Sequence, residues 1–165
     1  MPDPALAHLV AAVRALVGAA GADFADADIE EALRRRAIEA RGLPLRRVVL
    51  PDGTAHYEAG APDWASDGRF WSGTWISPAE ADWVAGRFRF SPDPGAGYLY
   101  GRRFDIYVVA ADLLDRWIAQ ILADPDVSIA DVEVNRSEIV RRARALADHY
   151  RAMAWGAATL DRGDM

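Results

Sequence analysis

The sequence predicts a mainly α fold: a four-helix bundle with a β-hairpin and an aromatic-rich loop between the second and third helices. Three observations support this fold class. Apolar residues recur at spacings of three and four at both ends of the chain, this period disappears between residues 46 and 90, and 165 residues suit one domain. We therefore expect one helical domain over residues 1–155, a β and loop excursion at about 46–92, and a C-terminal tail over 156–165.

The first two helices are predicted from their ends and their apolar stripes. Asp3 and Pro4 are typical of a helix start, and the stripe that follows ends near Gly18. A second helix is expected from Asp26 or Asp28, through Ile38, to the Gly-Leu-Pro stop at residues 42–44.

The middle of the chain predicts β-structure and a long loop. Residues 46–50 and 55–58 flank a Pro-Asp-Gly-Thr turn, which indicates a hairpin. A loop rich in Gly, Pro, Ser and Trp follows, and it ends in residues 87–90, whose strict alternation predicts a strand. We interpret Gly101 as part of a turn or of a helix start.

The last two helices follow from apolar periodicity and from their boundaries. A stripe from Tyr107 to Ile121 predicts a helix of about five turns, which Asp124-Pro125 ends. Asn135 is a suitable N-cap for the last helix, whose stripe extends to Met153.

The composition argues against most catalytic chemistries. Cysteine is absent and the three histidines are far apart, so we expect no metal site and no cofactor. Phosphate-binding, dinucleotide-binding and nucleophile-elbow motifs are missing. Asp105, Asp112 and Asp115 share a predicted helix, but solvated charge is the better interpretation than acid–base catalysis. We expect no enzyme, no membrane span and no secretory signal.

The charge pattern bears on possible partners. The formal net charge is −6, and all 19 basic side chains are arginine. The aromatic residues of segment 64–90 lie near arginines, a combination that can stack nucleic-acid bases or sugar rings. Because tight DNA binding depends on basic surfaces, we favour a satellite core or a protein interface for these aromatics.

Residues 100–117, Tyr-Gly-Arg-Arg-Phe-Asp-Ile-Tyr-Val-Val-Ala-Ala-Asp-Leu-Leu-Asp-Arg-Trp, carry a specific pattern. They resemble the Gly-x-x-Tyr-Asp-x-x-x-Ala-Ala-Ala-Asp-Leu-Leu-x-x-Trp segment of head–tail adaptor (connector) proteins of tailed bacteriophages and gene-transfer particles. Residues 135–138 and 146–154 are similar to that family's Arg-Ser-Gln and Leu-Ala-x-x-Tyr-Arg-x-x-Ala. The matching residues, which the resemblance implies are structural, are Gly101, Asp105, Ala110, Ala111, Asp112, Leu113, Leu114, Trp117, Tyr150 and Arg151. Phe104, Val109 and Glu138 depart from the pattern, and segment 64–83 does not align with it.

The resemblance implies an adaptor-type bundle and a structural virion protein at the neck of a particle, assembled in the host cytoplasm. Its members form homo-oligomeric rings, typically dodecamers, that bind the portal protein, extend the DNA channel and receive the next tail or stopper protein. Double-stranded DNA passes through such a ring without sequence-specific binding, which an acidic chain suits.

The same resemblance suggests where the partners bind. Candidate portal contacts lie in the C-terminal segment: Trp155, Leu160, Asp161 and Arg162. Candidates for the channel lumen or the tail-side partner are Trp64, Trp71 and Trp75. The alternative function is a small enzyme or ligand-binding module with segment 64–90 as its cleft.

Overall fold

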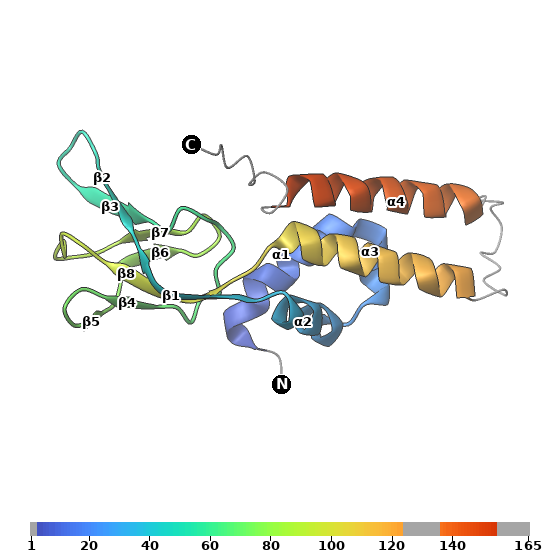
Figure 1. Ribbon diagram of the computed structural model, residues 1–165, viewed down its shortest axis with the longest axis horizontal. Helices are drawn as coiled ribbons and strands as arrows, with labels where there is room; N and C mark the ends of the chain where they lie inside the picture. The colour runs from blue at the N-terminus through green and yellow to red at the C-terminus, as the bar shows by residue number, and fades with distance from the viewer. Residues whose placement is uncertain (1–2, 124–135, 155–165) are drawn as a thin grey trace, which may run out of the picture. The chain divides into compact units, whose positions relative to one another are not determined.

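The computed structural model describes residues 3–123 and 136–154 of the chain. Within these ranges the chain forms four α-helices, two 3-10 helices and eight β-strands. Figure 1 labels the α-helices and the β-strands. The chain divides into two compact units: Met1–Leu9 with Arg36–Phe104, and Val10–Arg35 with Asp105–Met165. We call them the β unit and the helical unit. The predicted mainly α four-helix bundle is therefore wrong, because the fold is mixed α/β.

The β unit contains two antiparallel sheets of four strands each within the described residues. Sheet A has the order β1 (Ile38–Pro44), β8 (Tyr98–Arg103), β4 (Arg69–Trp71), β5 (Trp75–Ile76). Sheet B has the order β2 (Arg46–Val49), β3 (Ala55–Glu58), β7 (Arg87–Arg89), β6 (Glu80–Asp82). The predicted hairpin is confirmed as β2 and β3, and the predicted strand at residues 87–90 is confirmed as β7.

The core of the β unit is built mainly from aromatic rings of both sheets. Phe70 of sheet A packs edge-on against Phe88 of sheet B, with ring centroids 4.7 Å apart. Phe90 contacts both Phe70 and Tyr57 at 5.2 Å. Alternation places these rings inward, since neighbours in a strand point to opposite faces. The buried residues of this cluster are Leu45, Tyr57, Ala59, Trp64, Phe70, Phe88, Phe90 and Leu99.

The β-structure extends from Ile38 to Arg103, further than the predicted excursion at about 46–92. The second helix, α2, covers only Asp26–Arg35, because Ile38–Pro44 pairs with β8 instead of continuing the helix. Gly42 is consequently not a helix stop but the site of a register shift in β1, with φ +77°. Long-range strand pairing outweighs the weak local preference for helix here.

Gly101 likewise lies inside β8 and not in a turn or at a helix start, so that expectation is wrong. Tyr98 is exposed and Leu99 is fully buried, an alternation that suits a strand with one face in the core. A Cβ atom at Gly101 would lie 3.2 Å from the Cα of Gly68, so glycine permits a close approach of the two chain segments.

The remaining helices agree with their predicted positions. Asp3 caps the first helical segment, accepting a hydrogen bond from the Ala5 amide at 3.0 Å, and this segment comprises η1 (Pro4–Leu6) and α1 (Ala7–Val17). A short 3-10 helix, η2 (Gly18–Asp23), follows it. The third helix, α3, covers Ile106–Ala123, and the fourth, α4, covers Arg136–Met153. The predicted boundary residues between them, 124–125 and 135, lie outside the described residues.

Helices α3 and α4 run side by side in the helical unit (Figure 1). Ile118 of α3 is buried with Val140 and Ala143 of α4, and Trp117 packs against this group. The stripes that predicted both helices therefore form their shared contact.

Candidate interaction surface

The outer face of sheet A carries a group of aromatic side chains, of which Trp75 and Tyr98 are exposed and Trp71 and Tyr100 are half-buried. In β4, Phe70 faces the core, so Arg69 and Trp71 point to the opposite face. In β8, Leu99 faces the core and Tyr98 and Tyr100 point outward in the same way. The strand register places Tyr100 opposite Arg69 and Tyr98 opposite Trp71. We call Arg69, Trp71, Trp75, Tyr98 and Tyr100 the aromatic–arginine face.

Trp75 is the centre of this face. Its ring lies 5.2 Å from that of Trp71 and 5.3 Å from that of Tyr100, both in edge-on geometry. The Arg69 guanidinium lies 4.0 Å from the Trp75 ring centroid, within cation–π range. These contacts hold the side chain in place although 49% of Trp75 remains exposed to solvent. A large, pre-ordered aromatic surface of this kind is typical of interface hot spots.

The structure separates the three tryptophans that the sequence grouped as lumen or tail-side candidates. Trp71 and Trp75 lie on the aromatic–arginine face. Trp64 is fully buried, and its indole N–H donates to the Ala61 carbonyl at 2.7 Å. Because Trp64 exposes no side-chain surface, its place is in the core of the β unit and not among partner contacts.

Most residues of the adaptor-like motif that lie in α3 serve the helical unit. Asp105 caps α3 by accepting hydrogen bonds from the amides of Tyr107 and Val108, both at 3.2 Å. The motif residues that are buried along α3 are Ala110, Ala111, Leu113 and Leu114.

Further motif residues link the helices of this unit to one another. The Trp117 indole donates to Asp23 at 2.5 Å, and the Tyr150 hydroxyl donates to the Leu16 carbonyl at 2.8 Å. Arg151 of α4 pairs with Asp115 of α3 and, at 2.9 Å, with Asp148. These roles are structural, and none of them places reactive groups together. The candidate portal contacts Trp155, Leu160, Asp161 and Arg162 lie outside the described residues.

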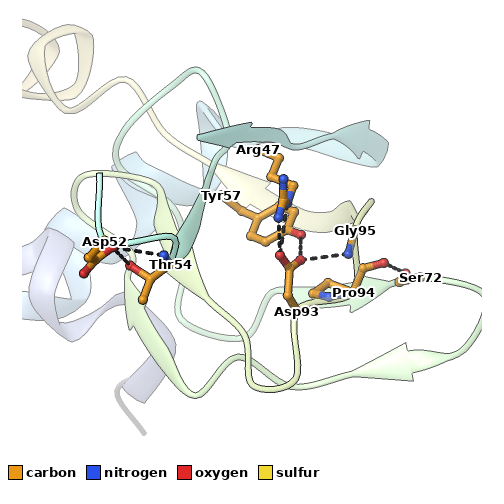
Figure 2. Close-up of polar contacts among 8 residues, drawn as sticks. All are labelled: Arg47, Asp52, Thr54, Tyr57, Ser72, Asp93, Pro94 and Gly95. Carbon is orange, nitrogen blue, oxygen red and sulfur yellow. Dashed lines mark hydrogen bonds and ion pairs between the residues drawn. The ribbon is translucent and has the colours of Figure 1, made fainter. Parts of the chain in front are cut away.

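A second polar feature of the β unit is a cluster around Asp93, which Figure 2 shows. One carboxylate oxygen of Asp93 accepts a hydrogen bond from the Tyr57 hydroxyl and a second one, 2.8 Å long, from the Gly95 amide. The other oxygen accepts from two nitrogens of the Arg47 guanidinium, at 2.5 and 3.1 Å. The hydrogen bonds from Arg47, Tyr57 and Gly95 hold the pKa of Asp93 well below its ordinary value. Burial, and secondarily the bond to Asp93, raises the pKa of Tyr57.

This arrangement suits a structural clamp better than an acid–base site. Asp93 is ionised at neutral pH and its oxygens accept four hydrogen bonds from three groups, so it has little capacity left to accept a substrate proton. Instead it joins β2 and β3 to the loop before β8, which positions the outward-facing tyrosines of that strand. Ser72 donates to the Pro94 carbonyl at 3.5 Å and ties the β4–β5 turn to the same loop (Figure 2).

Two further kinds of feature are absent from the described residues. Over residues 3–123 and 136–154, no three histidine, aspartate or glutamate side chains are grouped to bind a metal ion. In the same ranges every helix is too short or too polar to span a membrane.

Sequence reasoning missed four residues of these features: Arg47 and Asp93 of the clamp, and Tyr98 and Tyr100 of the aromatic–arginine face. The alternation of Tyr98, Leu99 and Tyr100 was the available signal for an exposed aromatic row. For the clamp the sequence offers no signal, because the side-chain partners of Asp93, Tyr57 and Arg47, are 36 and 46 residues away.

Comparison of the chain with protein-family models, with curated proteins and with solved structures finds no match.

Proposed function

We propose that this chain is a non-catalytic adaptor subunit that assembles into a ring at the neck of a phage-like particle and docks a protein partner through its aromatic–arginine face. The observation that carries the docking role is this face: Trp71, Trp75 and Tyr98 beside Arg69 on one side of a sheet whose other side is a packed core. Tryptophan, tyrosine and arginine are the residues most enriched at interface hot spots.

Support for the adaptor role comes from the resemblance over residues 98–155 and from the structural tasks of the motif residues in the helical unit. Support for a ring, a portal partner and a DNA channel rests on that resemblance and on the acidic net charge of −6. An acidic lining does not gain affinity for DNA through counterion release, so DNA can slide past it.

The alternative, a small enzyme or ligand-binding module with segment 64–90 as its cleft, has less support. Trp64, Phe70, Phe88 and Phe90 fill the core between the two sheets, and Trp83 packs against them. The exposed aromatics of this segment lie on the face of a sheet, which is a geometry that favours protein docking over enclosure of a small molecule.

The direct test measures assembly with the cognate portal protein. The purified chain is analysed alone and with portal rings by light scattering and electron microscopy, and we expect a ring of this chain on the portal. Trp75→Ala should weaken the docking that uses this face by about tenfold or more. Val84→Ala is the matched control, because Val84 is an equally exposed apolar residue of the same unit, 52% against 49%. Absence of any association with the portal would contradict the adaptor proposal.

A further inference from the structure

Strand β1 forms one edge of sheet A, and a groove lies along it. Its neighbours in the groove are the connection at residues 59–61 and Arg103 of β8. The groove has a volume of about 510 Å³, within the range of ligand-binding clefts. Three of the residues that line the groove have small side chains, namely Ala40, Ala59 and Ala61. Trp64 also lines it.

The backbone of β1 offers hydrogen-bonding groups at this edge. The Arg102 carbonyl accepts from the Ala65 amide, so even-numbered residues of β8 direct their backbone groups away from β1. Gly101 and Arg103 therefore face β1, and their register partners are Ala40 and Ile38.

Glu39, which lies between those partners, and Arg41, which follows Ala40, consequently direct their N–H and C=O groups to the open edge. No backbone group of residues 3–123 or 136–154 bonds to them there. Edge strands with such groups are the usual sites of strand addition.

Arg103 gives the groove a charge preference. Its side chain is half-buried and lines the groove, and among the described residues it has no hydrogen bond or ion pair. Arg41, the other arginine of the groove, already pairs with Glu39 at 2.7 Å. A half-buried cation without a partner favours an incoming carboxylate, since charge-assisted hydrogen bonds are among the strongest polar contacts.

We propose that the β1 edge binds an extended acidic segment of a different protein as an added antiparallel or parallel strand. Backbone bonds to Glu39 and Arg41 supply the pairing, and an aspartate or glutamate of the added strand pairs with Arg103. The small side chains of Ala40, Ala59 and Ala61 leave room for apolar residues that alternate with the acidic one. This binding site is separate from the aromatic–arginine face, and it does not depend on the proposed adaptor function.

The test uses the full chain and a displayed library of random decapeptides. The best enriched peptide is synthesised together with a matched peptide in which each Asp and Glu is replaced by Asn or Gln. Hydrogen exchange is then followed at the amides of Glu39 and Arg41, with and without peptide. We expect enrichment of acidic, alternating sequences and at least tenfold slower exchange at these two amides.

Two pairs of variants separate the backbone from the charge. Arg41→Pro removes the edge N–H and leaves the β1–β8 ladder intact, whereas Arg41→Ala keeps that N–H. We expect Arg41→Pro to abolish binding and Arg41→Ala to retain it. Arg103→Gln should weaken binding of the acidic peptide at least tenfold and of the neutral peptide little. Arg69→Gln, which changes an exposed arginine on the outer face of sheet A, should bind as the wild type does.

Three results would overturn the proposal. The first is a library without acidic enrichment, and the second is a bound peptide that leaves exchange at Glu39 and Arg41 unchanged. The third is concentration-dependent protection of these amides without peptide, because this would assign the edge to a second copy of the chain. Near-ultraviolet circular dichroism confirms that each variant is folded. All of these measurements are independent of portal binding, so failure here leaves the adaptor proposal standing.

Discussion

Replacing Trp64 by alanine should destabilise the β unit far more than the same change at Trp75. Trp64 is fully buried, so its removal leaves a large cavity, and truncation of a buried tryptophan costs about 3–5 kcal/mol of unfolding free energy. The substitution also deprives the Ala61 carbonyl of the indole N–H that it accepts at 2.7 Å. Trp75, at 49% exposure, loses two edge-on contacts and one cation–π contact, together worth about 1.5–2 kcal/mol at an exposed site.

The assay is urea unfolding followed by circular dichroism, with hydrogen exchange by mass spectrometry to assign the loss to a unit. Since total stabilities are commonly about 5–15 kcal/mol, Trp64→Ala removes a large share of the unfolding free energy. Trp64→Phe is therefore the milder second variant: it keeps an aromatic ring, loses the N–H donor and should cost about 1–3 kcal/mol. The reasoning is refuted if Trp64→Ala and Trp75→Ala cost the same, or if the faster exchange appears in α3 and α4 instead of the strands.

Three further predictions follow from the backbone and from charge. Asp105→Ala should lower the unfolding free energy by about 1 kcal/mol through loss of the α3 cap, and hydrogen exchange at the amides of Tyr107 and Val108 should accelerate; unchanged exchange there would contradict the cap. Gly86→Ala should lower the unfolding free energy by about 1 kcal/mol more than Gly53→Ala does, as thermal unfolding can measure. Both glycines have positive φ, but only at Gly86 would the new Cβ lie 2.2 Å from a backbone atom, the Ala61 carbonyl oxygen. Because the folded-state pKa of Asp93 is depressed, its stabilisation is complete above about pH 4 and is lost as the pH falls through that lower pKa. The melting temperatures of wild type and Asp93→Asn should therefore converge as the pH is lowered from 5 toward 2, and a constant difference would contradict the clamp.

Local signals were sufficient where neighbouring residues determine the structure. Asp3 predicted the first cap, the apolar stripe from residue 107 predicted α3, and the Pro-Asp-Gly-Thr turn predicted the pairing of β2 with β3. In each case the residues that interact are close in sequence, so propensity and periodicity carry the information.

Local signals failed where a distant strand determines the structure. Ile38 continues the apolar stripe of the second helix, yet it pairs with Arg103, which lies 65 residues away. The same limit applies to the tryptophans. Trp64, Trp71 and Trp75 lie in one irregular stretch of sequence, and only the pairing of β4 with β5 and β8 decides which of them reach the surface. The candidate site could therefore be predicted as an aromatic group but not as a face.

The two sheets of the β unit differ in what they leave available for a partner. The described edges of sheet B carry charges that already have partners within the unit: Glu80 of β6 pairs with Arg89, and Arg46 of β2 pairs with Glu58. Sheet A has ordered aromatic rings on its outer face, and at its β1 edge it has backbone groups without partners and an arginine, Arg103, without an ion pair in the described residues. Binding provides partners for unpaired polar groups and covers exposed aromatic surface. We therefore expect the β unit to bind its partners through sheet A, and charge-removing substitutions at Glu80 or Arg46 should leave this binding unchanged.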